Sequence, residues 1–288
     1  MTRNESLHKV FTVGGKSCFL LDLRSERDVN RNQAMGAAQL AAFKKWLQTR
    51  TKNEEIMIVS SIPFFVTYRK FINYTGELKT ELKDDLHDGW DSRYNVAQRD
   101  SLIRWLLEAR IGKNVKPYIV SGDIHAGGIA EIWYDDETNN NLCLAERKKD
   151  RRVLAYEIIA SGLNHETLNQ GGIFENFYSK AKRHAKDLRV NDNLIEHIAA
   201  NGKNYSIDNF FRAYDNNLNF GAIRFTPGKT FLHTFLFSYQ KSDHVQELVV
   251  EAEWDKTEAM DRKHYKIRNA SCDKFNYLPP LPQMRRNI

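Results

Sequence analysis

The sequence contains no apolar run that approaches the roughly 18 residues needed for a membrane-spanning helix. Its first ten residues are too polar for a secretory signal peptide. Cysteine is scarce, since the chain has only three, an odd number, and they lie far apart. These absences argue against a membrane protein and against a disulfide framework. They indicate a reducing compartment, which we take to be the cytoplasm.

Several catalytic signatures are also missing. The sequence has no Gly-x-Ser-x-Gly elbow, no Walker loop and no Cys-x-x-Cys pair, so serine hydrolase, nucleotide-loop and zinc-ribbon classes lack support. Neither sign of charge dominates, because 43 basic residues face 37 acidic ones. The basic clusters are short, and short charge runs usually face water. Nucleic acid is therefore not indicated as a partner, although a mild positive field attracts phosphate-bearing substrates.

The 288 residues are 41% hydrophobic, enough for the core of one large domain or two small ones. Strand-like and helix-like periodicities alternate over the first 160 residues, which predicts an α/β fold. Helices are expected at residues 36–48, 96–111 and within 172–200. Strands are expected at residues 17–23, 56–60, 117–121, 129–134, 153–160, 222–225, 231–239 and 247–254. A long polar stretch at 68–95 is too long for an idle connection and predicts a lid or binding loop.

The sharpest chemical signal is the run Ser121-Gly122-Asp123-Ile124-His125, which directly follows a predicted buried strand. Ligands of open α/β sheets bind beyond the carboxyl ends of strands, where Asp123 and His125 would lie. A carboxylate with an imidazole suits zinc, manganese or iron, and such metals lower the pKa of bound water. The alternative is a structural turn that Asp123 caps and His125 supports. The spacing alone leaves both interpretations open.

This run resembles the last metal-binding motif of the PhoD-like alkaline phosphatase and phosphodiesterase family, within the calcineurin-like metallophosphatases. There an apolar strand leads into Gly-Asp-x-His. Further pieces resemble the same family in the right order, including a strand that ends in Leu-Asp-x-Arg-Ser-x-Arg. They lie at residues 20–27, 35–47, 58–63, 90–99, 156–165 and 219–221. The resemblance covers roughly residues 10–225.

The resemblance implies a metallophosphatase-type αββα sandwich that lacks the N-terminal part of the usual domain. Residues 1–165 would form the C-terminal portion of the core, and residues 166–288 a family-type extension packed on the same domain. The implied activity is metal-dependent hydrolysis of a phosphoester by a metal-bound hydroxide. Asp123 and His125 would bind divalent or trivalent ions (Fe, Mn, Zn or Ca). The centre would be multinuclear and completed by residues outside this chain.

The chain departs from the family because the first three metal motifs, which should precede the Leu-Asp-x-Arg strand, are absent. Two residues do not supply the ligands of a binuclear site. We therefore expect the chain alone to be incomplete and to expose apolar sheet surface. A partner polypeptide or self-association would cover that surface. The alternative is a non-catalytic interaction or regulatory subunit that retains the fold.

The resemblance also nominates residues for substrate binding. Arg24 and Arg27 follow a strand end, and the planar guanidinium group suits phosphate, although ion pairs with nearby carboxylates would also explain them. Trp90 would either line a substrate pocket or anchor its loop to the core. His165, in a run that copies part of a family motif, is a near-site candidate or a structural residue. No catalytic residue is assigned.

Overall fold

The computed structural model describes residues 6–64, 89–90, 92, 94–122, 127–136, 151–160, 196–215, 218–237 and 245–255. These residues form eleven strands, two α-helices and a short 3-10 helix, Val29–Arg31. The predicted α/β class is confirmed. Within this part of the chain, no helix combines the length and the apolar character needed to cross a membrane.

The larger sheet has eight strands in the order β1-β2-β3-β4-β6-β5-β8-β7. Their bounds are β1 Lys9–Val13, β2 Lys16–Leu20, β3 Glu55–Val59, β4 Lys116–Ser121, β5 Gly127–Asp136, β6 Arg152–Ala160, β7 Glu196–Ala200 and β8 Lys203–Asp215. Strands β2, β3, β4 and β6 run parallel to one another, whereas the remaining pairs are antiparallel. Strands from both halves of the chain therefore share one sheet.

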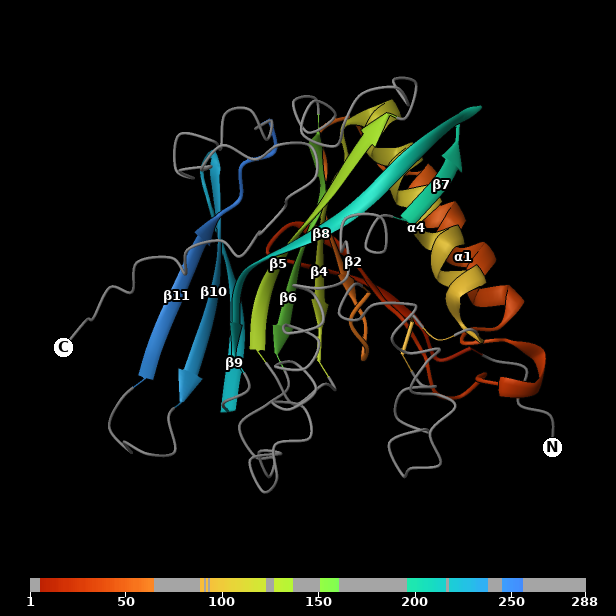
Figure 1. Ribbon diagram of the computed structural model, residues 1–288, viewed down its shortest axis with the longest axis horizontal. Coiled ribbons are helices and arrows are strands. Elements are labelled where there is room, and N and C mark those ends of the chain that lie inside the picture. The colour runs from red at the N-terminus through yellow and green to blue at the C-terminus, as the bar shows by residue number, and fades with distance from the viewer. Residues whose placement is uncertain are drawn as a thin grey trace, which may run out of the picture.

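Two helices, α1 (Ala37–Gln48) and α4 (Val96–Lys113), cover one face of this sheet (Figure 1). Apolar side chains recur at helical spacing on each, such as Phe43 and Leu47 on α1. They pack with Phe19, Ile58 and other sheet residues in the main core. Helix α4 ends at a left-handed asparagine, Asn114, which closes the helix as such residues commonly do.

A second sheet of three strands covers the opposite face (Figure 1). It consists of β9 (Leu218–Thr226), β10 (Lys229–Phe237) and β11 (Val245–Glu251) in the order β11-β10-β9. Leu232 and Leu248 pack on Tyr118 and Tyr156 of the large sheet. The described residues thus form three layers: two helices, the large sheet and the small sheet.

The predicted elements before residue 160 are confirmed in the described part of the chain, where they appear as β2, α1, β3, α4, β4, β5 and β6. The predicted strands after residue 220 appear as β9, β10 and β11. The helix expected within 172–200 is wrong where it is described, because residues 196–200 form β7. In β7 the buried residues Ile198 and Ala200 alternate with exposed ones, which is the period of a strand.

Strands β1 and β8 were not predicted. The signal for β1 was the pair Gly14 and Gly15, whose φ angles of 56° and 75° form the tight turn into β2. Most of the loop predicted at residues 68–95 lies outside the described residues.

Candidate functional site

The carboxyl ends of the four parallel strands meet at one edge of the large sheet. Leu20 of β2 pairs with Val59 of β3, and Val59 pairs with Val120 of β4. Ser121 then pairs with Ile159 near the end of β6. We call this the carboxyl edge. It is the edge at which open α/β sheets bind their ligands.

The antiparallel strand β5 begins at the same edge, since Gly127 pairs with Ala160 of β6. The end of β4 and the start of β5 therefore flank the end of β6. The two predicted metal ligands, Asp123 and His125, belong to the sequence between them but lie outside the described residues, as does His165. Among the residues that are described, no group of three or more His, Cys, Asp and Glu side chains is placed to hold a metal ion.

A fully buried carboxylate, Glu157, joins three segments at the carboxyl edge. Its Oε1 atom accepts hydrogen bonds from the Ser121 hydroxyl (2.8 Å) and from the Phe64 backbone N–H (2.9 Å). A buried carboxylate is costly unless hydrogen bonds compensate for its lost hydration. Glu157 therefore fixes the end of β4 and the segment after β3 relative to β6. Glu157 lies within the resemblance at residues 156–165 without an expected role, although an ionisable residue inside an apolar strand is a signal that often marks a functional or structural role.

Trp90 lies beside this cluster. Its indole N–H donates to the Ser60 hydroxyl (3.3 Å), and its ring stacks on Phe64 with 5.3 Å between ring centroids. Only 1% of the residue is exposed. These contacts are those of a core anchor for the segment around residue 90, and a role for Trp90 in substrate binding stays a prediction.

Asp22 organises the chain as it leaves β2. Its carboxylate accepts hydrogen bonds from the backbone N–H groups of Leu7, Arg24 and Ser25, and from the Ser25 hydroxyl. Partial burial by itself raises the pKa of Asp22, but these hydrogen bonds outweigh it and lower the pKa to about 2. The side chain of Gln39 clamps the same residue by bonding both its N–H and its C=O. The turn that presents Arg24 is therefore held from both sides.

The two candidate arginines belong to the segment that leaves β2 at the carboxyl edge. Arg24 is exposed and Arg27 is partly buried. Arg31 follows in the short 3-10 helix, where its guanidinium group pairs with Asp28 at 3.2 Å. The structure thus brings Arg24 to the same edge as Ser121.

Asn219 reaches this edge from the second sheet. It is fully buried, and a Cβ added to Gly127 would lie 2.5 Å from its Cγ atom. The start of β5 therefore needs glycine at position 127 because the Asn219 side chain occupies that space. Asn219 lies within the resemblance at residues 219–221 without an expected role, and no local sequence pattern indicates that β9 meets β5 here.

Comparison with known proteins finds a distant relative. An uncharacterised protein of Saccharomyces cerevisiae is 27% identical over 179 residues, which cover 54% of this chain and 24% of the yeast protein. The chain thus spans about a quarter of that protein's length. No protein-family model and no solved structure matches the chain.

Proposed function

We propose that this chain is part of a metal-dependent phosphoester hydrolase of the PhoD-like kind, built on a metallophosphatase sandwich. The observation that carries the proposal is the arrangement of strand ends. Four parallel strands end at one edge, and the Gly-Asp-x-His sequence belongs between the end of β4 and the start of β5 there. The two packed sheets, with helices on one outer face, support the sandwich.

In this proposal Asp123 and His125 contribute ligands to a metal centre that residues outside this chain complete. The bound ion would supply an activated water. Arg24 and Arg27 would hold the phosphoryl oxygens, because a guanidinium group donates two parallel hydrogen bonds to such an anion. Glu157 acts through Ser121, whose hydroxyl it holds at the last position of β4.

Edge strand β1 supports the proposal that another polypeptide or a second copy covers the chain. All five of its residues are exposed, including Val10 (55%), Phe11 (40%) and Val13 (50%). β1 lies at the end of the strand order, so one side of it has no partner within the described sheet. An exposed apolar edge of this kind invites the addition of a strand.

A non-catalytic interaction or regulatory subunit is the second candidate. The observation that favours it is that three polar side chains at the carboxyl edge are buried and hydrogen-bonded to other protein groups rather than open to a substrate. They are Ser60, Ser121 and Trp90. In that case the cluster would preserve the fold rather than serve a substrate.

The deciding experiment is the metal content of the purified chain, measured by mass spectrometry. If a second copy supplies the further ligands by self-association, we expect about one or two transition-metal ions per chain, lost in the double variant Asp123→Asn, His125→Asn. A matched control, Asp255→Asn with His197→Asn, removes the same side chains from exposed positions and should keep the metal. A wild-type chain without metal would contradict a metal site assembled by this chain or by its self-association, and it would favour the second candidate for the chain by itself.

Sedimentation velocity tests whether a second copy of the chain covers β1, because it measures self-association. We expect the wild-type chain to self-associate and the variant Phe11→Lys, Val13→Lys to be monomeric. Ile111→Lys, at another exposed apolar position, is the control and should associate normally. A wild-type chain that remains monomeric at every concentration reached contradicts self-association.

A further inference from the structure

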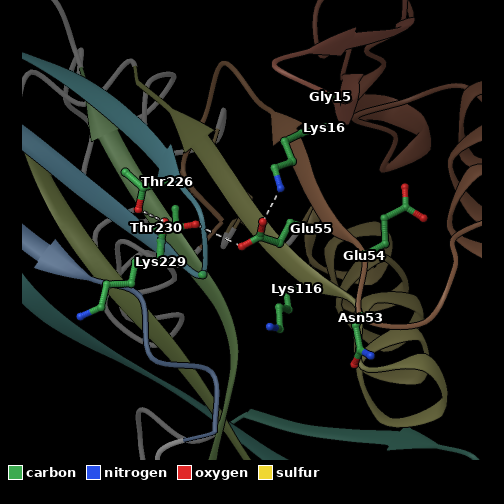
Figure 2. A pocket seen from close by; sticks show the side chains of 10 residues that line it. Gly15, Lys16, Asn53, Glu54, Glu55, Lys116, Thr226, Lys229 and Thr230 are labelled. Atoms are coloured by element: carbon green, nitrogen blue, oxygen red, sulfur yellow. Dashed lines mark hydrogen bonds and ion pairs between the residues drawn. The ribbon is translucent and has the colours of Figure 1, made fainter.

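The opposite edge of the large sheet contains a cavity of about 340 Å³. It lies at the amino ends of β2, β3 and β4, which contribute Lys16, Glu55 and Lys116, and the β9–β10 turn closes its other side (Figure 2). Since β2, β3 and β4 run parallel, this amino edge is distant from the carboxyl edge along the strands. The volume is within the range of small-molecule sites.

The lining carboxylates already have partners. Glu55 forms an ion pair with Lys16 and accepts hydrogen bonds from the Tyr118 hydroxyl (3.0 Å) and the Thr230 hydroxyl (3.1 Å). Burial by itself raises the pKa of Glu55, but the hydrogen bond and the charge of Lys16, with the other donors, lower it overall. Glu55 is therefore a neutralised carboxylate built into the wall.

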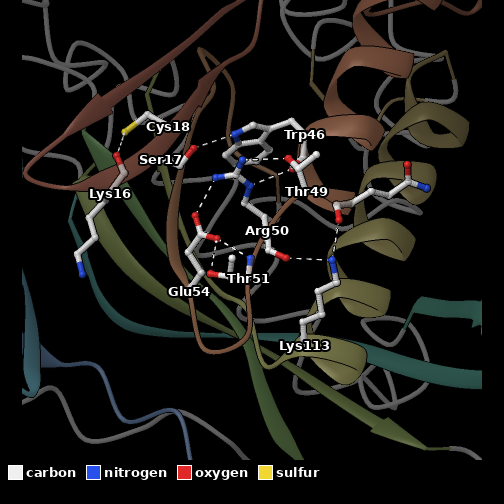
Figure 3. Close-up of polar contacts among 10 residues, drawn as sticks. Lys16, Ser17, Cys18, Trp46, Thr49, Arg50, Thr51, Glu54 and Lys113 are labelled. Atoms are coloured by element: carbon white, nitrogen blue, oxygen red, sulfur yellow. Dashed lines mark hydrogen bonds and ion pairs between the residues drawn. The ribbon is translucent and has the colours of Figure 1, made fainter.

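Glu54, the other lining carboxylate, is also held by an ion pair and hydrogen bonds (Figure 3). Arg50 donates to its Oε1 atom at 2.7 Å, and the Thr51 backbone N–H donates to its Oε2 atom at 2.6 Å. Arg50 in turn is fixed by the Trp46 carbonyl at 2.9 Å and lies over the Trp46 ring. This wall is accordingly preorganised and does not need a ligand to balance its charge.

The lining lysines are in excess. The lining contains three lysines, Lys16, Lys116 and Lys229, but two carboxylates, Glu54 and Glu55, so one positive charge is in excess. The partners Arg50 and Glu251, which do not line the cavity, carry opposite charges and leave this excess unchanged. Lys229 pairs with Glu251 at 2.8 Å, but both side chains are more than one-third exposed, so water screens that pair.

Lys116 is the source of the excess. Its backbone is fixed, since its N–H donates to the Glu54 carbonyl at 2.8 Å and it pairs with Glu55 across the sheet. In Figure 2 its side chain is seen between Lys229 and Asn53, and all three residues line the cavity. Among the lining lysines of the described chain, Lys116 is the one whose ammonium group has neither a hydrogen bond nor an ion pair.

The mouth of the cavity is open. At Gly15 and Gly228 an added Cβ would meet no atom of the described residues within 4 Å, so no described side chain covers the backbone of these two turns. Within the described residues, these two turns therefore leave the mouth of the cavity open to a ligand.

We propose that this cavity binds a small phosphate-bearing anion, with Lys116 as the principal contact and Lys229 and Lys16 as supporting charges. A phosphate group presents several oxygens in different directions, so it can contact more than one ammonium group at once. A carboxylate has two oxygens in one plane and is less suited to this. Lysine binds phosphate as a point charge, which suits a site without a rigid fork. The site is separate from the proposed hydrolase site, and either one stands without the other.

The test is a titration of the ¹⁵N-labelled chain with inorganic phosphate at constant ionic strength, followed by NMR. We expect saturable shifts of the amides of Gly15, Glu55, Lys116 and Gly228. Lys116→Met should weaken binding about tenfold, as expected for the loss of a charge-assisted hydrogen bond. Lys45→Met is the control, because it removes an equal charge from an exposed position on α1 and should leave the affinity unchanged.

Two further variants keep the test decisive if Lys116→Met does not fold. Lys116→Arg retains the charge and should retain binding, whereas Lys229→Met should weaken it about threefold, since its contact is more exposed. Shifts confined to residues such as Arg24 and Ser121 would place phosphate at the carboxyl edge and overturn the proposal. Equal weakening by Lys45→Met would show a diffuse electrostatic effect and would overturn it as well.

Discussion

The two edges of the large sheet handle charge in opposite ways. At the carboxyl edge the carboxylate of Glu157 is fully buried and bonded to a hydroxyl and a backbone N–H. At the amino edge Glu55 and Glu54 are partly exposed and paired with Lys16 and Arg50. At the first edge a hydroxyl and a backbone N–H thus bind a carboxylate that water does not reach, whereas at the second edge the ion-paired carboxylates remain partly hydrated. We expect substitutions at the first edge to cost more stability.

Glu157→Ala should have the largest effect. It leaves the Ser121 hydroxyl and the Phe64 N–H buried without their acceptor, and we expect a loss of about 3 kcal/mol in the free energy of unfolding. Urea denaturation measures this loss. Glu157→Gln keeps an acceptor oxygen and should lose less than half as much. Equal losses in the two variants would show that the space filled by the side chain, rather than its hydrogen bonds, matters.

Asp22→Asn tests a partly exposed carboxylate at the same edge. The folded-state pKa of about 2 lies below the ordinary 3.8, so the ionised carboxylate stabilises the fold above about pH 4. That contribution is lost as the pH falls toward 2. After allowance for solvent screening, we expect Asp22→Asn to lose about 1 kcal/mol at pH 7. The difference from wild type should shrink in urea denaturation at pH 3, and a constant difference would contradict the assignment.

The ion pair of Lys16 with Glu55 should contribute less than the network around Glu157. A double-mutant cycle with Lys16→Met and Glu55→Gln should give a coupling of about 1 kcal/mol, because both side chains are only partly buried. Raising the salt concentration should reduce the coupling. A coupling as large as the loss in Glu157→Ala would remove the distinction between the edges.

The smallest effect is expected for Glu251→Gln. Its partner Lys229 is well exposed, so water already screens the pair. The midpoint of urea unfolding should stay at the wild-type value within error. A clear shift of the midpoint would show that this pair is structural and that Lys229 is less available to a ligand than we propose.

Periodicity in the sequence was sufficient to predict the elements around the carboxyl edge. The runs that became β3, β4 and β6 are largely apolar because their residues, apart from the first residue of β6, are buried or half-buried, and α1 and α4 have an apolar stripe. Strand β1 gave a weaker signal, since its five residues are exposed and its apolar side chains do not alternate with polar ones.

Contacts between distant segments were beyond sequence reasoning. The amino-edge cavity is lined from turns near residues 15, 53, 116 and 228, and only the packing of the small sheet on the large one brings them together. Likewise Asn219 meets Gly127 because β9 crosses the start of β5. Each of these residues alone resembles an ordinary turn or strand residue, so its role depends on the tertiary structure.

Strand β1 also has a kinetic consequence. It hydrogen-bonds to β2 alone among the described strands, and none of its side chains is buried. Few contacts are lost when such a strand separates, so β1 should open in local fluctuations of low free energy while the rest of the sheet stays folded. Its amide protons should therefore exchange with solvent much earlier than those of β3 and β4, and binding of a strand to this edge should slow that exchange.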